Sequence, residues 1–292
     1  MKANINGTEI FFDINGLQYV PDGPRMRERP VCFILHGGPG LDHSDYIPDT
    51  TPYSELMQMV YVDNRGSGRS GRPALSTCNM EQNVDDIEAL RSYLGLDKIV
   101  VMGQSYGGMV AQGYAIKYPQ NVEALILLMT APCGEALEDA KIELLKRGNP
   151  EQISFGRYLF DGTFKSNEHY AELFRLFFNL YSYQKKELTQ ASIDAMSREI
   201  VSYEIINDGF KNYVRSFDYR DALKTLDVPT LIVGGEEDWI TPVKYSYMMK
   251  ELIPNSELKV FENCGHSVFA DAPEFLYAEI HKFLKMHTKC RD

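Results

Sequence analysis

The sequence predicts an α/β protein whose strands form a mostly parallel sheet. Short apolar runs bounded by glycine or proline alternate along the chain with amphipathic helical patterns. Such runs are typical of strands that are buried on both faces of a parallel sheet. The chain has 292 residues, 44% of them hydrophobic, and is therefore long enough to bury a sizeable core.

The strands and helices are predicted in chain order. Alternating apolar and polar residues at Thr8–Asp13 indicate an early antiparallel strand. The buried parallel strands are predicted at Val31–Leu35, Gln58–Val62, Lys98–Met102, Ala124–Met129, Thr230–Val233 and Leu258–Phe261. Helices are predicted from their apolar periodicity at Met80–Leu94, Met109–Lys117, Val243–Leu252 and Pro273–Met286.

One long segment, from Cys133 to Leu226, breaks the alternation. It contains no clear strand, and it carries amphipathic stretches at Tyr170–Tyr181 and Gln190–Ile206 together with many Phe and Tyr residues. We therefore expect a core formed by residues 1–132 and 227–292, with a helical cap at 133–226. Most of the aromatic side chains are expected to pack within the cap, while a few line a pocket beneath it.

The charge of the chain argues against nucleic acid and anionic membranes as partners. The formal net charge is −11, and no basic stretch interleaves with aromatic residues. No apolar run approaches the roughly 18 residues that a membrane span needs. The N-terminal residues Met1–Asn6 lack the apolar region of a signal peptide, so a cytoplasmic location is expected.

No cofactor or metal is expected. The five cysteines form no C-x-x-C pair, and neither H-E-x-x-H nor a P-loop occurs. The stretch Gly66–Gly71 matches G-x-G-x-x-G, but a dinucleotide site would need a helix to begin within the motif. Here Pro73 follows, and the next helical pattern begins only near Met80. We interpret this segment as a tight loop in which Asp63 or Arg65 fixes neighbouring loops.

A candidate nucleophile, Ser105, lies in the pentapeptide Gly103-Gln104-Ser105-Tyr106-Gly107. This G-x-S-x-G pattern joins a predicted strand to a predicted helix, as in the nucleophile elbow of α/β-hydrolases. Glycine is needed on both sides of the serine because the turn leaves no room for a side chain. The alternative is a glycine-rich turn without catalytic function.

The candidate base and acid follow in the chain order that this fold requires, serine first, then the acid, then histidine. His266 comes directly after the last predicted strand, whereas His169, His281 and His287 fall in helical segments. The loop after Thr230–Val233 offers Glu236, Glu237 and Asp238. Asp238 is our choice because its short side chain suits a buried hydrogen bond to an imidazole, although a turn or helix-cap function is the alternative.

An oxyanion hole requires two backbone N–H groups. Tyr106, the residue after the candidate nucleophile, is expected to supply one of them at a helix N-terminus. The first parallel strand ends in His36-Gly37-Gly38-Pro39-Gly40, where Gly38 is the expected second donor and Gly37 a candidate for substrate contact. His36 precedes Ser105, so we interpret it as a residue that shapes the loop.

These segments together resemble the proline iminopeptidase family of α/β-hydrolases. The resemblance is carried by HGGPG at 36–40, DNRGSGRS at 63–70, GQSYGG at 103–108, the Asp238 loop and Gly265-His266. It implies an eight-stranded sheet with helices on both faces, a helical cap, and Ser105, Asp238 and His266 as a catalytic triad. It also implies Gly38 and Tyr106 as oxyanion donors.

The substrate-binding residues depart from the family pattern. Family aminopeptidases hold the substrate ammonium group with glutamates, one in the cap and one just after the catalytic aspartate. Here Trp239 follows Asp238, and the cap position falls near Asn207. Glu204 is therefore the candidate anchor for the amine, and Trp239 either forms a wall of the pocket or packs in the core.

We thus predict a serine hydrolase that acts on a short-peptide or small-molecule substrate. The first hypothesis is an aminopeptidase that releases N-terminal proline or other small residues. The alternatives are an esterase, amidase or lactonase, and a small-molecule receptor without turnover on the same scaffold.

Overall fold

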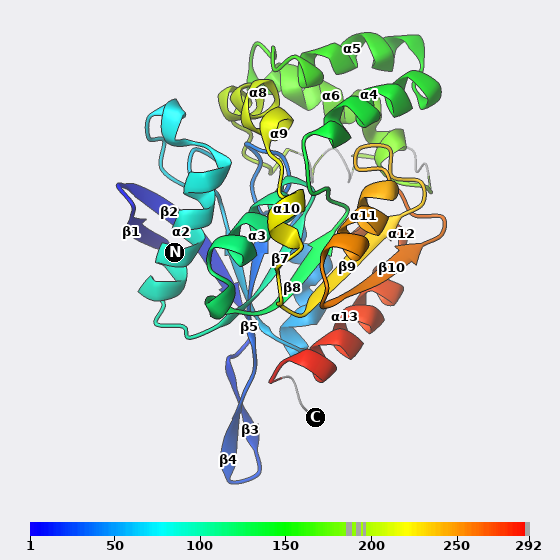
Figure 1. Cartoon of the computed structure of the whole chain (residues 1–292). Helices are drawn as coiled ribbons and strands as arrows, with labels where there is room; N and C mark the ends of the chain where they lie inside the picture. Colours follow the sequence, from blue (N-terminus) through cyan, green and yellow to red (C-terminus); the bar gives the residue numbers. More distant parts are fainter. Residues whose placement is uncertain (185–188, 191–193, 195–196, 290–292) are drawn as a thin grey trace.

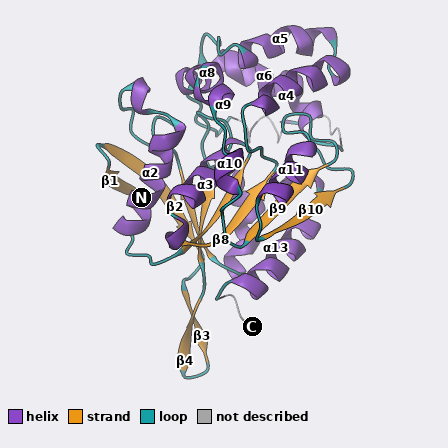
Figure 2. Ribbon diagram, viewed as in Figure 1, coloured by secondary structure: helices purple, strands orange, loops and turns teal. Residues whose placement is uncertain are grey.

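The computed structural model describes residues 1–184, 189–190, 194 and 197–289. Within them lies an eight-stranded sheet of order β1-β2-β6-β5-β7-β8-β9-β10 (Figures 1 and 2). Its strands are β1 (Lys2–Ile5), β2 (Thr8–Asn15), β5 (Val31–Leu35), β6 (Gln58–Val62), β7 (Ile99–Gln104), β8 (Val122–Leu128), β9 (Thr230–Gly235) and β10 (Ser256–Phe261). β1 and β2 are antiparallel, and the strands from β6 onward are parallel to one another. The predicted fold class is confirmed.

Helices cover both faces of the sheet (Figure 1). α2 (Met80–Tyr93), α3 (Tyr106–Lys117) and α11 (Lys244–Leu252) lie on one face. α13 (Pro273–His287) covers the other face, together with the segment formed by α1 (Tyr46–Thr50) and the 3₁₀ turn Thr51–Glu55. Because side chains alternate along a strand, Phe33 and Leu35 of β5 face the first layer while Ile34 faces the second.

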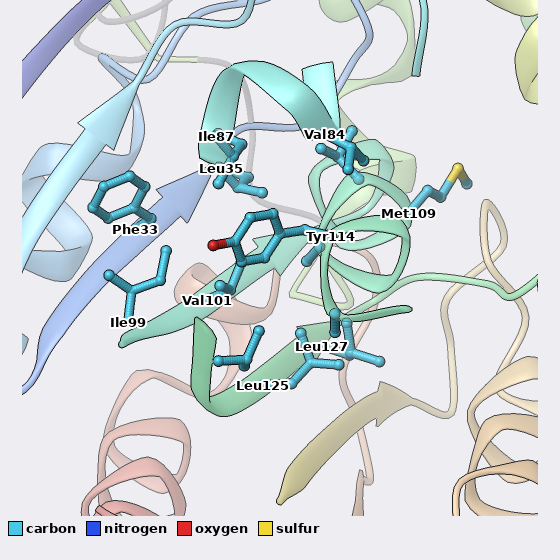
Figure 3. Close-up of a cluster of buried hydrophobic side chains, with 14 of the residues drawn as sticks. Phe33, Leu35, Val84, Ile87, Ile99, Val101, Met109, Tyr114, Leu125 and Leu127 are labelled. Carbon is cyan, nitrogen blue, oxygen red and sulfur yellow. The ribbon is translucent and has the colours of Figure 1, made fainter. Parts of the chain in front are cut away.

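The core of the first face is built from strand side chains and two helices (Figure 3). Tyr114 of α3 lies among Val101, Leu125 and Leu127 of β7 and β8, and all four are fully buried. Burying aliphatic side chains of this size contributes about 1.5–3 kcal/mol each. This layer fixes α3, whose N-terminus carries the candidate nucleophile loop.

The segment between β8 and β9 is helical. It contains α4 (Glu135–Arg147), α5 (Pro150–Phe160), α6 (Asn167–Tyr181), α8 (Tyr203–Lys211), α9 (Tyr213–Ser216) and α10 (Arg220–Leu223). Figure 1 shows α4, α5, α6 and α8 grouped at one end of the molecule, beyond the sheet. Their apolar side chains form a cluster of their own, which includes Leu144, Leu173 and Phe177. Part of the predicted stretch Gln190–Ile206 lies outside the described residues.

The structure differs from the sequence prediction in the strands near the N-terminus and at the start of helix α3. β1 pairs with β2, and a separate hairpin of β3 (Tyr19–Asp22) and β4 (Arg25–Glu28) projects from the body (Figure 1). These strands are too short for a periodicity to be recognised. Helix α3 begins at Tyr106, three residues before the start at Met109 that periodicity predicted, because Gly107 and Gly108 in its first turn carry no apolar signal.

A buried ion pair ties the loop after β6 to helix α2. Arg65 Nε and Nη2 donate to the two carboxylate oxygens of Asp86 at 2.6 Å each, and both side chains are about 3% exposed. The hypothesis that Arg65 fixes neighbouring loops is consistent with this geometry. Removing one partner leaves an uncompensated charge in a medium that solvates it poorly.

We expect Arg65→Met to lower the free energy of unfolding by about 3–5 kcal/mol, because the Asp86 carboxylate stays buried without its partner. Denaturation in urea, followed by circular dichroism, measures this change. Lys224→Met is the control, since Lys224 pairs with Asp221 and the two side chains are 58% and 96% exposed. Equal shifts for the two variants would contradict a stabilising function of the buried pair.

Candidate active site

Ser105 occupies a sharp turn between β7 and α3. Its backbone lies at φ 55° and ψ −123°, a region that L-residues rarely adopt. A Cβ at Gly103 would lie 2.2 Å from the Gly107 carbonyl oxygen, so only glycine fits at this position. The Ser105 N–H donates to the Leu128 carbonyl at 3.0 Å, and Thr130 Oγ1 donates to the Ser105 carbonyl at 2.7 Å. The strained turn is thus held by hydrogen bonds to the neighbouring strand.

His266 and Asp238 form a buried pair. His266 Nδ1 lies 2.8 Å from Asp238 Oδ2, and the two residues are 6% and 2% exposed. The other oxygen, Oδ1, accepts from the N–H groups of Ile240 and Thr241 at 2.8 and 3.0 Å, and Thr241 Oγ1 donates to Oδ2 at 2.8 Å. A carboxylate can only accept hydrogen bonds, so Nδ1 of the neutral His266 ring carries the proton and donates to Asp238, which leaves Nε2 as an acceptor.

The competing candidates lie elsewhere. Glu236 and Glu237 are exposed, and Glu237 pairs with Arg147 at 3.1 Å. His169 packs against Tyr158 within the aromatic cluster of the helical segment. His287 lies on the last helix, α13, and its Nε2 is 3.2 Å from Glu257 Oε1 of β10. Among the acidic residues of this loop, Asp238 is therefore the one in contact with His266.

Ser105 and His266 line the same cavity, which has a volume of about 620 Å³. The cavity lies between the carboxyl ends of the strands and the helical segment. Gly37, Gly38, Tyr106 and Trp239 also belong to its wall. Much of the remaining wall is apolar and comes from the helical segment, with Leu137, Leu159, Phe160, Phe174 and Phe210 among its residues.

The loop after β5 contributes backbone groups to the cavity. The Gly37 N–H donates to the Tyr46 hydroxyl at 2.9 Å, so it is already satisfied. Gly38 lies at φ +112°, where a side chain would be strained, and its N–H has no hydrogen-bond partner among the described residues. An unpaired N–H group on a cavity wall is what an oxyanion donor requires.

Three carboxylates that the sequence analysis did not single out line the cavity, those of Asp45, Asp49 and Glu199. Glu199 lines the wall and forms no hydrogen bond or ion pair among the described residues. Burial raises its pKa well above the ordinary value of a glutamate, and the negative charges of Asp45 and Asp42 add to this effect. The chain next to it is attached to the loop after β5, because Ile200 N donates to Asp42 Oδ2 at 3.1 Å.

The expectation for Glu204 is corrected. It lies on the exposed side of the first turn of α8 and is not part of the cavity wall. Asn207, near the cap position of the family, bonds to the backbone of Phe164 through both amide atoms, at 2.9 and 2.8 Å. Helical periodicity alone could not show that Glu199, in the loop before this helix, lies in the cavity wall while Glu204 does not. Trp239 is 1% exposed and both packs against Phe177 and lines the cavity.

The architecture and the site define an α/β-hydrolase. Residues 30–273 match the family model of the alpha/beta hydrolase fold. The proline iminopeptidase PfmaB of Pestalotiopsis fici is 31% identical over 284 residues, covering 94% of this chain and 99% of that protein. The proline iminopeptidase of Lactobacillus helveticus is 30% identical over 311 residues, covering 99% and 98%. The structure of a proline iminopeptidase from Mycobacterium smegmatis superposes with a TM-score of 0.75 at 20% identity, covering 98% of each chain.

The chain therefore belongs to the alpha/beta hydrolase family and, within it, to the proline iminopeptidase group. It is a hydrolase with the fold that the sequence predicted. Across the described residues, no helix combines the length and the apolar character needed to cross a membrane.

Proposed function

We propose that the protein is a serine hydrolase that cleaves acyl bonds through an acyl-enzyme at Ser105. The observation that carries this proposal is the buried His266–Asp238 pair, 2.8 Å apart, in the wall of the cavity that Ser105 also lines. In this reaction Ser105 Oγ attacks the acyl carbon while His266 Nε2 takes its proton. Asp238 holds the imidazole in the required tautomer and stabilises the imidazolium that forms.

The remaining steps use the same groups. The N–H groups of Gly38 and Tyr106 stabilise the negative oxygen of the tetrahedral intermediate. The imidazolium of His266 then protonates the leaving group, which departs and leaves an ester on Ser105. Water attacks that ester with His266 as base, and collapse of the second intermediate releases the acid and returns the proton to Ser105.

We infer further that the acyl group is an N-terminal residue with a free amine. Glu199 supports this inference because its carboxylate is unpaired within the described residues and lines the same cavity as Ser105. An ammonium group would supply the positive partner that this carboxylate lacks, and a buried charge is stable only when it is paired. The helical segment 133–226 acts as a cap, and its apolar wall receives the side chain of the substrate.

The second candidate is hydrolysis of neutral esters or lactones. The raised pKa of Glu199 favours this alternative, because a protonated carboxyl can donate a hydrogen bond to an uncharged substrate. Proline β-naphthylamide and p-nitrophenyl acetate distinguish the two functions. Turnover of the ester alone would overturn the aminopeptidase assignment while leaving the serine hydrolase intact.

The triad assignment predicts a specific pattern of losses. Asp238→Asn should lower kcat by about 10⁴-fold, because the amide no longer selects the productive tautomer of His266. Ser105→Ala should abolish both turnover and labelling by a fluorophosphonate probe. Glu237→Gln, on the same loop but exposed, is the matched control and should retain full activity. Labelling of the Ser105→Ala protein would show that another residue is the nucleophile.

The amine assignment predicts a dependence on Glu199 and on pH. Glu199→Gln should raise KM for proline β-naphthylamide by about 10- to 100-fold, the effect of losing one charge-assisted hydrogen bond. The pKa of Glu199 is raised, so its carboxylate becomes protonated as the pH falls through that higher value. In the wild type, KM should therefore rise as the pH falls, and this rise should begin at a pH above the ordinary pKa of a glutamate. Glu199→Gln should remove this pH dependence.

The control for this measurement is Glu204→Gln, which changes an exposed carboxylate of the same segment. It should leave KM and its pH profile unchanged. Hydrolysis of p-nitrophenyl acetate, which has no amine, should be insensitive to both substitutions. A KM that does not change in Glu199→Gln would show that the amine binds elsewhere.

A further inference from the structure

We propose that His36 is a positioning residue that fixes the orientation of the Gly37–Gly38 peptide and so prepares the oxyanion hole. This role rests on the proposed function, because it presupposes that Gly38 N–H stabilises an oxyanion formed at Ser105. His36 is the first residue of the loop after β5. Its side chain is fully buried and does not line the cavity. It would therefore act on the reaction only through the backbone.

The hydrogen bonds of His36 define its tautomer. The Asn64 N–H can only donate, and it lies 3.1 Å from His36 Nε2, so this nitrogen is the acceptor. The proton of the neutral ring is then on Nδ1, which donates to the Gly37 carbonyl at 2.7 Å. Burial lowers the pKa of His36 and thereby favours the neutral ring, although the carboxylates of Asp63 and Asp42 act in the opposite direction.

Planarity of the peptide transmits this bond to the cavity. In a trans peptide the C=O and the following N–H point in opposite directions. With the Gly37 carbonyl held toward His36, the Gly38 N–H points away from His36. Gly38 lies in the cavity wall, and a Cβ at Gly37 would be 3.6 Å from Ser105 Cβ, so this part of the loop is beside the nucleophile.

The loop needs such a restraint because of its composition. A peptide flanked by two glycines can rotate into the reversed orientation at little steric cost. That reversal would turn the Gly37 carbonyl, with its negative end, toward the position of the oxyanion. The bond from Gly37 N–H to Tyr46 restrains the preceding peptide, but it leaves the Gly37–Gly38 peptide free to rotate.

Two substitutions separate the two hydrogen bonds of the imidazole. In His36→Asn the amide nitrogen can take the place of Nδ1 and donate to Gly37, while the acceptor for Asn64 is lost. In His36→Gln the amide oxygen reaches the place of Nε2 and accepts from Asn64, while the donor to Gly37 is lost. Each variant loses one buried hydrogen bond, so a purely structural role predicts similar effects of the two on activity.

The experiment compares both variants with the wild type on whichever of p-nitrophenyl acetate and proline β-naphthylamide the wild type hydrolyses faster. We expect His36→Gln to lower kcat by about 10- to 100-fold with KM unchanged, less than the 10²- to 10³-fold loss when an oxyanion donor is removed outright. Its affinity for phenylboronic acid, which forms a tetrahedral adduct with serine, should fall by a similar factor. His36→Asn should retain kcat within about threefold.

Thr230→Val controls for lost stability, since it removes a buried hydrogen bond of 2.8 Å at the opposite end of β9. Equal losses of kcat in His36→Asn and His36→Gln, or a loss in Thr230→Val as large as that in His36→Gln, would overturn the positioning role. Wild-type protein that neither hydrolyses these substrates nor reacts with a fluorophosphonate would overturn the proposed function and this role together. Wild-type activity with indistinguishable His36 variants would overturn this role alone.

Discussion

The contact between helix α3 and strand β5 at Gly107 is the constraint on which the site depends. A Cβ at this position would lie 2.0 Å from the carbonyl oxygen of Leu35, so the two backbones meet without any side chain between them. Leu35 is the last residue of β5, and the loop with His36 to Gly40 follows it directly. The approach therefore brings the start of α3, with Ser105 just before it, next to the glycines of that loop. A larger residue at 107 would separate the candidate nucleophile from one of its two proposed oxyanion donors.

The parallel register of the sheet gathers the other groups at the same edge. β5, β7, β9 and β10 all end at this edge, and their following loops carry the HGGPG segment, Ser105, Asp238 and His266. This is why the core and the Asp238–His266 contact could be predicted from sequence: apolar runs locate the strands, and parallel strands bring their carboxyl ends together. Hydrophobic periodicity did not reach the first residues of α3, because Gly107 and Gly108 have no apolar side chain, and only the G-x-S-x-G motif indicated a helix N-terminus at Tyr106.

Glu199 illustrates what the sequence could not provide. It lies five positions before Glu204, and neither position carries a motif or a turn signal that marks it as functional. Their difference arises from tertiary contacts. Ser202 N donates to the Gly40 carbonyl at 2.8 Å, so the chain before α8 runs along the loop after β5 and places Glu199 in the cavity wall, while the helix that follows turns Glu204 to solvent.

Under the proposed function, this attachment also couples substrate recognition to catalysis. A Cβ at Gly40 would lie 2.7 Å from the Ser202 carbonyl, so the two segments are in direct backbone contact, and Asp42 adds a second link through Ile200 N. Arg69 donates to the same Asp42 oxygen at 2.7 Å and holds it in place. Under the proposed function, the spacing between the carboxylate that binds the amine and the N–H that binds the oxyanion is set by one short loop. The α-amine and the carbonyl carbon of an N-terminal residue are themselves separated by a fixed distance, one carbon atom. A rigid spacing between their two binding groups therefore selects for that backbone, while the apolar helical wall above it is left to discriminate among side chains.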